Sequence, residues 1–375
     1  MALSKNKQAF FALLRAGLWE KSIRLLPYDN IDYSEILDLA QEQSVVGLMA
    51  AGMEHVEDCK PAKQDVLQFI GQALQLEQQN QAMNYFIGVL VDKMRKEGIY
   101  ALLVKGQGIA QCYERPLWRS CGDVDFFLSD ENYEKAKRYL VPLASHVEPE
   151  NKIKKHLGLA IDPWVVELHG TLKGSLSRRI NIVLEEIKRD TFQGGNVRTW
   201  MNGNTPVSLL KAENDALYVF SHFFFHFYSE GVGLRQICDW CRLLWTYRDD
   251  LDPKLLENQL KKMGLVTEWK AFGAFAVDYL GMPVKAMPLY SEDKRWKKKA
   301  DKICSFIIEV GNFGHNRDNS YFNKPFVIRK AISLGRRCGD LIRHARIFPL
   351  DSFRFLPGIV INGVRAALKG LNRWN

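Results

Sequence analysis

The hydrophobic pattern of the chain changes at Ile99, and this change limits the folds that the chain can adopt. Before it, residues 65–96 are rich in Gln, Leu and Met and contain no Pro, which predicts one long helix with a break near Gly71. The compact apolar run at 99–104 predicts a buried strand. Helical and strand patterns then alternate, as helix 109–113, strand 123–128, helix 131–140 and strand 164–168. Such alternation is typical of a small domain that combines helices with a sheet.

Helical patterns return after this segment, at residues 208–228 and 232–247. We therefore predict the α+β class, with a small mixed-sheet core flanked by helical regions. The predicted boundaries are an N-terminal helical region at 1–96, the core at 97–205, and a C-terminal helical region with a basic tail at 206–375.

Length and composition are those of an ordinary globular protein. The 375 residues correspond to two or three domains of roughly 150 residues each. No stretch reaches the ~18 apolar residues of a membrane-spanning helix, and Arg15 interrupts the short apolar run at 9–14, so we expect no signal peptide. The seven cysteines are odd in number and scattered, which favours reduced thiols and a cytoplasmic location.

The net charge of +9 belongs to the C-terminal end of the chain. From Tyr321 onward there are 11 Lys and Arg residues against 2 acids, which leaves 41 charges of each sign in the first 320 residues. This balance argues against nucleic acid as a partner of the whole chain. Residues 353–369 mix basic and apolar side chains, so this segment either docks on the helical region or lies on an anionic membrane surface. A peripheral position at the inner membrane face is therefore the alternative to a purely cytoplasmic one.

The clearest chemical signal is the pair of acids Asp123 and Asp125 in a strand candidate. Side chains alternate along a strand, so both aspartates point to one face while Val124 points to the other. Two adjacent carboxylates repel each other unless a cation lies between them, and such pairs suit Mg²⁺ or Mn²⁺. Glu167, in the strand candidate 164–168, would join them if the strands are neighbours. Three acids around two ions form a clamp for phosphoryl or nucleotidyl transfer; a solvated strand end is the structural alternative.

A turn with two glycines precedes the aspartates. Gly106 and Gly108 lie between the strand at 99–104 and a predicted helix, where the backbone can approach a phosphate closely. Lys105 would bind a triphosphate through its single positive charge, and Arg119 would bind it through two parallel hydrogen bonds. Each has a structural alternative, because Lys105 can simply reach solvent and Arg119 can pair with an aspartate.

These residues resemble the nucleotidyltransferase superfamily of DNA polymerase β-like enzymes and, more narrowly, the uncharacterised bacterial nucleotidyltransferase family. The resemblance is carried by Leu103-Val104-Lys105-Gly106, by Arg119 and by Gly122-Asp123-Val124-Asp125. It extends over about residues 35–245, through Glu167-Leu168-His169, His222, His226, Arg235 and Asp239. The chain departs from the superfamily pattern at Lys105-Gly106-Gln107, where a Gly-Ser or Gly-Gly pair is usual.

The resemblance implies that Asp123 and Asp125 are metal ligands and that Glu167 is the third catalytic acid. It also implies that the turn at 105–107 and Arg119 hold the triphosphate of an NTP. The candidate pocket residues are His169, His222, His226, Arg235 and Asp239.

Several of these residues have alternative interpretations. His222 and His226 share a helix face, which suits either zinc or, more readily, a helix packed under the active site. Arg235 and Asp239 form either an ordinary helix salt bridge or a wall of the acceptor pocket. Cys238-x-x-Cys241 lies inside a predicted helix, which favours buried structural thiols over a redox motif.

We therefore predict an enzyme that uses Mg²⁺ or Mn²⁺ to move an NMP from an NTP to a hydroxyl or phosphate of an unidentified acceptor, releasing pyrophosphate. One alternative is a catalytically degenerate relative that binds a nucleotide or a protein without turnover. A second is an accessory protein of surface polysaccharide synthesis. RNA modification has little support, because the charge of the first 320 residues is balanced.

Overall fold

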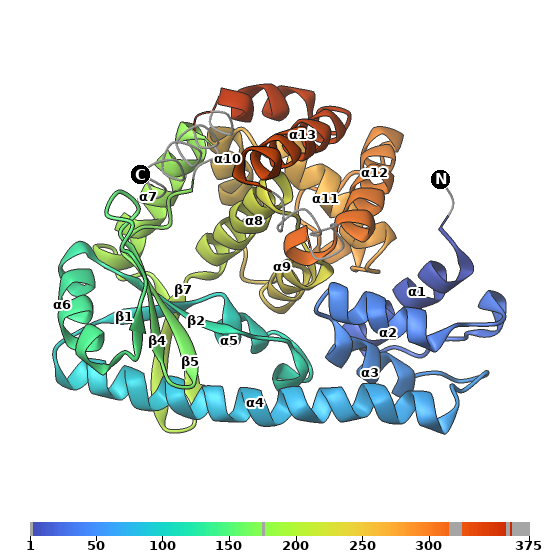
Figure 1. Ribbon diagram of the computed structural model, residues 1–375, viewed down its shortest axis with the longest axis horizontal. Coiled ribbons are helices and arrows are strands. Elements are labelled where there is room, and N and C mark those ends of the chain that lie inside the picture. Colours follow the sequence, from blue (N-terminus) through green and yellow to red (C-terminus); the bar gives the residue numbers. More distant parts are fainter. Residues whose placement is uncertain (1–2, 175–176, 315–324, 358–360, 362–375) are drawn as a thin grey trace.

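The computed structural model describes residues 3–174, 177–314, 325–357 and 361, and contains a seven-stranded mixed sheet surrounded by helices (Figure 1). The strand order is β3-β4-β5-β2-β1-β7-β6. The strands are β1 Ala101–Val104, β2 Asp123–Leu128, β3 His146–Val147, β4 His156–Ile161, β5 Trp164–His169, β6 Val197–Asn202 and β7 Thr205–Leu210. β1 and β2 are antiparallel, and β2 and β5 are parallel. The prediction of an α+β fold is confirmed.

Four helices precede the sheet: α1 Lys5–Trp19, α2 Tyr33–Glu42, α3 Val46–Glu54 and α4 Lys63–Lys96. The 34 residues of α4 run beneath both the N-terminal helices and the sheet (Figure 1). The predicted break near Gly71 is wrong, because α4 continues through this exposed glycine. One glycine costs only about 1 kcal/mol in a helix, which packing along the rest of α4 outweighs.

The strands predicted at 99–104, 123–128 and 164–168 are confirmed, but four others were not predicted. The predicted helix at 208–228 begins too early: β7 extends to Leu210 and α8 covers Ala212–Ser229. A short apolar run fits a buried strand as well as a helix, so periodicity alone could not separate the two. The helix predicted at 109–113 corresponds to α5, which covers Gly106–Ala110 and so begins and ends three residues earlier.

The two faces of the sheet are covered by different helices. One face presents Val124 and Phe126 to α4 and to α6 (Asp130–Leu140), whose first turn is capped by the hydroxyl of Ser129. The opposite face carries the acidic side chains of β2 and β5, and α7 (Arg178–Phe192) and α8 lie over it. Polar side chains on this second face are therefore enclosed between the sheet and two helices.

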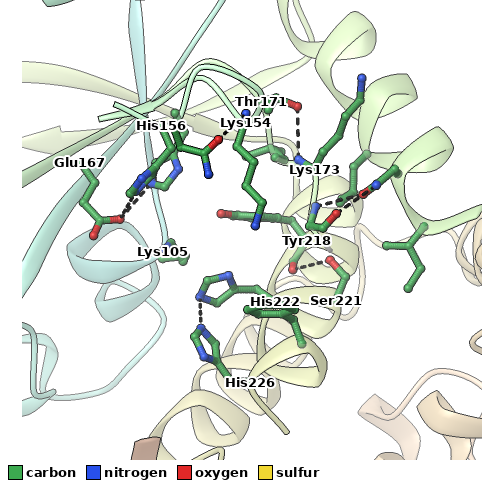
Figure 2. Close-up of a pocket in the computed structure, with 18 of the residues that line it drawn as sticks. Lys105, Lys154, His156, Glu167, Thr171, Lys173, Tyr218, Ser221, His222 and His226 are labelled. Atoms are coloured by element: carbon green, nitrogen blue, oxygen red, sulfur yellow. Dashed lines mark hydrogen bonds and ion pairs between the residues drawn. The ribbon is translucent and has the colours of Figure 1, made fainter. Parts of the chain in front are cut away.

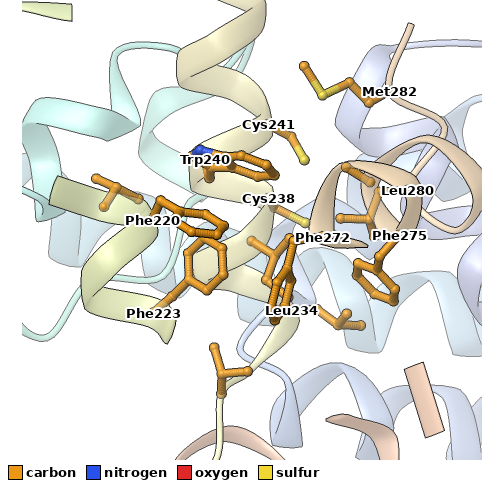
Figure 3. Close-up of a cluster of buried hydrophobic side chains, with 14 of the residues drawn as sticks. Phe220, Phe223, Leu234, Cys238, Trp240, Cys241, Phe272, Phe275, Leu280 and Met282 are labelled. Atoms are coloured by element: carbon orange, nitrogen blue, oxygen red, sulfur yellow. The ribbon is translucent and has the colours of Figure 1, made fainter. Parts of the chain in front are cut away.

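The remaining helices are α9 Leu234–Thr246, α10 Pro253–Met263, α11 Val266–Asp278, α12 Lys294–Val310 and α13 Phe326–Ala345. Short 3₁₀ turns are η1 Leu26–Tyr28, η2 Pro116–Trp118, η3 Val141–Leu143, η4 Val284–Ala286 and η5 Asn312–Gly314. Aromatic side chains of α8, α9 and α11 form a dense core, which also holds both thiols of the Cys238-x-x-Cys241 pair (Figure 3). Both cysteines are fully buried, and burial raises their thiol pKa values, as structural thiols require.

The basic amphipathic segment predicted at 353–369 lies mostly outside the described residues. Its described part continues a helical stretch at 349–357, in which the ring of Phe355 packs against Phe224 and Tyr228 of α8. Phe353, two residues earlier, is 78% exposed. None of the described helices is both long enough and apolar enough to cross a membrane.

Candidate active site

Three neighbouring strands bring the predicted acids together. In the parallel pairing of β2 with β5, Asp125 lies directly beside Glu167. In the antiparallel pairing of β1 with β2, Val104 lies opposite Asp125, so Lys105 follows at the same edge. One carboxylate oxygen each from Asp123, Asp125 and Glu167 lies within 4.8 Å of the other two.

Asp125 is the buried centre of this cluster. Its side chain is 1% exposed, and its Oδ1 atom lies 2.8 Å from Lys105 Nζ and 2.7 Å from His169 Nε2. Burial opposes ionisation of Asp125, but the charge of Lys105 and the hydrogen bond from His169 outweigh it, so the pKa of Asp125 falls below its usual value. Asp125 is therefore an anion at neutral pH.

Asp123 is in the opposite electrostatic situation. Burial and the nearby charge of Asp125 raise the pKa of Asp123 above its usual value. Among the described residues, no hydrogen bond or ion pair reaches its carboxylate. A divalent cation would relieve this repulsion, and a set of carboxylate oxygens is the donor set that Mg²⁺ and Mn²⁺ prefer. The residues present therefore fit such an ion.

Lys105 supplies a fixed positive charge beside the acids. Its backbone has φ +58° and ψ −147°, a conformation that is costly for a residue with a side chain. Burial opposes protonation of its amine, but Asp125 outweighs this effect and raises the pKa of Lys105. The strained turn thus aims a permanently charged ammonium group at Asp125.

Glu167 is held by two histidines. His156 Nε2 and His169 Nε2 lie 3.1 Å and 3.3 Å from Glu167 Oε2. Hydrogen bonds from these two imidazoles lower the pKa of Glu167 well below its usual value. His169 was a predicted pocket residue, whereas His156 was missed because β4 carries no motif and reaches the site only by pairing with β5.

A cavity of about 450 Å³ opens over this cluster (Figure 2). Its floor is formed by Lys105, Asp123, Glu167 and the two histidines of β4 and β5, and its opposite wall is formed by α7 and α8. The α8 wall includes Tyr218, Ser221, His222, Phe225 and His226. The two predicted histidines of this helix therefore face the cavity.

The two α8 histidines contact each other, with 3.2 Å between their Nε2 atoms. Burial, together with the charge of Lys105, lowers the pKa of His222 well below its usual value, so this ring is neutral. Among the described residues, His222 and His226 belong to no group of three side chains that could hold a metal ion. This favours the interpretation of α8 as a helix packed under the site over a zinc site.

Lys154 is a pocket residue that sequence reasoning missed. It lies on the turn before β4, and its ammonium group points into the cavity, 5.8 Å from the centre of the Phe225 ring (Figure 2). Burial lowers the pKa of Lys154. A lysine in a turn without a motif has no sequence signal, because its position over the acids depends on the β4–β5 hairpin.

Arg119 and Asp239 lie away from this cavity, in a buried ion pair. Arg119 Nε and Nη2 lie 2.9 Å and 2.6 Å from the two oxygens of Asp239, which also accepts a hydrogen bond from Tyr113. The structure places neither side chain in the cavity wall, so the predicted phosphate contact of Arg119 and the predicted pocket position of Asp239 gain no support from it. The alternative of a structural pair holds, because a bidentate carboxylate satisfies a guanidinium that is only 4% exposed.

Two further predicted side chains do not line the cavity. Arg235 donates to the Ser120 carbonyl and lies 4.0 Å from Asp239, as in an ordinary helix pair. Gln107 is buried under α4, where its amide donates to Asn80 Oδ1 at 2.7 Å. Any role of the turn at 105–107 toward phosphate would therefore fall to Lys105 and the backbone of Gly106.

Two carboxylates and a lysine at the floor of a cavity, with a third carboxylate buried beside them, are an arrangement suited to metal-assisted transfer of phosphorus-containing groups. The family model described as uncharacterised nucleotidyltransferase matches residues 29–281. The chain belongs to this nucleotidyltransferase family, as the resemblance predicted, and the match supports a nucleotidyltransferase activity. No curated protein and no solved structure matches the chain.

Proposed function

We propose that this protein is a metal-dependent nucleotidyltransferase that moves an NMP from an NTP to a hydroxyl or phosphate acceptor and releases pyrophosphate. The observation that carries the proposal is the convergence of Asp123, Asp125 and Glu167, whose oxygens lie within 4.8 Å of one another. Asp123 and Glu167 line the cavity, and Asp125 is buried beside them. The family match supports the same reaction class. Mg²⁺ or Mn²⁺, held by these acids, would polarise the transferred phosphoryl group and neutralise its developing charge.

The three acids have different roles in this proposal. Asp125 remains ionised because Lys105 and His169 stabilise its charge, so it is a permanent anchor for a cation. Asp123 adds the second carboxylate on the same strand face. Glu167 serves the acceptor oxygen as a metal ligand, since its lowered pKa makes it a weak base, and its two histidines hold it in place.

Two lysines would hold the triphosphate. Lys105 Nζ lies at the acids, and Lys154 approaches from the opposite side of the cavity mouth. Because Lys154 is half-buried and contacts an aromatic ring rather than a carboxylate, an anionic ligand would stabilise its charge. The Gly106 turn remains a proposed backbone contact for the same phosphates.

The test measures NTP binding by calorimetry and pyrophosphate release across a panel of hydroxyl and phosphate acceptors. With the acceptor that gives turnover, Asp123→Asn and Glu167→Gln should each lower the rate by about 10³-fold, because each removes several kcal/mol of charge stabilisation. Asp249→Asn, an exposed aspartate outside the site, is the matched control and should keep full activity. Full activity in Asp123→Asn, or no NTP binding with either metal, would contradict the proposal.

The catalytically degenerate relative is a second candidate with its own supporting observation. The ammonium group of Lys105 already neutralises Asp125, so the acid cluster is partly compensated by the protein itself. NTP binding without pyrophosphate release from any acceptor in the panel would favour this candidate.

A further inference from the structure

We propose that His156, His169 and Glu167 form a second cation site, for a divalent transition-metal ion such as Mn²⁺, Co²⁺ or Zn²⁺. This site lies beside the Asp123, Asp125 and Glu167 set and shares Glu167 with it. The proposal concerns metal binding, and it stands whether or not the protein transfers nucleotides.

The sheet places the two imidazoles as a pair. His156 and His169 lie directly opposite each other in the antiparallel pairing of β4 with β5, and their ring centres are 4.9 Å apart. Both Nε2 atoms lie near the same oxygen of Glu167, and His169 Nε2 also lies 2.7 Å from Asp125 Oδ1. The register of two strands, rather than a flexible loop, therefore sets the spacing of the three donor atoms.

The distances between these donors match those between ligands of one metal ion. Ligands about 2.1 Å from an ion and about 90–110° apart lie about 3.0–3.4 Å from each other. The two nitrogen–oxygen distances to Glu167 are 3.1 Å and 3.3 Å. All three donor atoms lie within 4.8 Å of one another, so one ion could contact them together once His169 Nε2 gives up its hydrogen bond to Asp125.

The donor types distinguish this site from the acid cluster. Two imidazole nitrogens and one carboxylate oxygen suit transition metals, whereas Mg²⁺ prefers oxygen donors. The nearby carboxylates of Asp123 and Asp125 would partly compensate the charge of the ion. All three proposed ligands line the cavity of about 450 Å³, which gives the ion a route to the site.

The same geometry permits a purely structural role, in which both imidazoles donate hydrogen bonds that orient Glu167. The test therefore has to detect nitrogen ligation. Mn²⁺ is titrated into the full chain without a histidine tag and without nucleotide. Pulsed electron paramagnetic resonance then reports ¹⁴N couplings from any coordinating imidazole.

We expect ¹⁴N couplings in the wild-type protein and in Asp123→Asn, because Asp123 is not a ligand of this site. His156→Gln should weaken Mn²⁺ affinity at this site by at least about tenfold, the loss that even an outer-shell partner can cause. His146→Gln, which changes an exposed histidine of β3 in the same sheet, is the control and should leave affinity unchanged. Thermal unfolding of each variant checks that it is folded.

Bound Mn²⁺ without ¹⁴N couplings, or equal affinity of the wild type and a folded His156→Gln, would overturn the proposal and leave the histidines as positioning residues for Glu167. If His156→Gln does not fold, the couplings of the wild-type protein alone decide the question. Because nucleotide is absent, a negative result leaves the proposed transfer activity untouched.

Discussion

At the scale of single residues, the site depends on how each charge is compensated. Asp125 is compensated by Lys105 and His169, and Glu167 is compensated by His156 and His169. Asp123 has no such partner among the described residues, which makes it the carboxylate with the greatest need for a cation. Basic side chains around two of the acids stabilise the folded state of this buried cluster, and the uncompensated third acid fits the metal ion proposed above.

The Arg119–Asp239 pair gives a prediction at this same scale. Burial opposes ionisation of Asp239, but Arg119 outweighs it and lowers the pKa of Asp239, so both partners are charged. Asp239→Asn leaves the guanidinium of Arg119 buried without a counter-charge, and the free energy of unfolding should fall by about 3–5 kcal/mol. Urea unfolding measures this loss.

The control for Asp239→Asn is Arg235→Gln. Arg235 is more exposed than Arg119, and its guanidinium lies 4.0 Å from the Asp239 carboxylate. This change should cost less than about 1 kcal/mol. A variant Asp239→Asn as stable as the wild type would show that the pair is not structural and would reopen a ligand role for Arg119.

At the scale of elements, α11 and the helical stretch at 349–357 meet through two buried acids. Glu268 of α11 and Asp351 are 3% exposed each. Asp351 accepts a hydrogen bond from Arg354, and the charge of Lys299 acts on Glu268 without a hydrogen bond. Burial and the hydrogen bond to Asp351 raise the pKa of Glu268 to about 10 from 4.5. The folded protein therefore keeps a proton on Glu268 that the unfolded chain loses.

This difference predicts how stability depends on pH. Between about pH 5 and pH 9 the folded state binds more protons at Glu268 than the unfolded state, so its contribution to stability decreases as the pH rises. Glu268→Gln removes this dependence and should raise the free energy of unfolding at pH 9 by at least about 1 kcal/mol relative to the wild type. Urea midpoints measured from pH 5 to pH 9 check the prediction.

Glu257→Gln on neighbouring α10 is the control, because this partly exposed acid forms an ion pair with Lys261 across one helix turn. It should change stability by less than about 0.5 kcal/mol at every pH. If the wild type and Glu268→Gln differ in free energy of unfolding by the same amount at every pH, the assignment of the proton to Glu268 is contradicted.

At the scale of the whole molecule, the stretch at 349–357 presents two different faces. Phe355 packs on α8, as the docking interpretation of the tail expected, while Leu350 and Phe353 are 70% and 78% exposed. Arg346 and Arg354 lie in the same region. We propose that this outward face contacts an anionic membrane surface, since exposed apolar side chains beside basic ones favour such a position.

Vesicle flotation of the full chain tests this proposal. We expect the protein to float with vesicles that contain anionic lipid, less so at high salt, and the double variant Leu350→Ser, Phe353→Ser to remain unbound. Leu67→Ser on α4, which changes a leucine that is 59% exposed, is the control and should float like the wild type. Identical behaviour of all three proteins would remove the membrane proposal and leave the predicted cytoplasmic location.

The predicted boundaries at 96/97 and 205/206 stay predictions.

The sequence by itself determined three strands of the site, β1, β2 and β5, and the acids on them. An apolar run identifies a buried strand, and alternation within Asp123-Val124-Asp125 assigns the carboxylates to one face, because both rules are local. The long helix α4 was predicted for the same reason. These features depend on residues that are neighbours in the chain.

Only the tertiary structure decided which distant side chains complete the site. His156 and Lys154 reach the acids through the β4–β5 hairpin, and Arg119 turns from the cavity toward Asp239, 120 residues away in the chain. Strand order and burial decide which side chains pair in this way. A buried charge without a counter-charge is costly, so each buried charged group pairs with the nearest opposite charge. A motif assigns residue types to a reaction, but the packing of the whole chain assigns each charge to its partner.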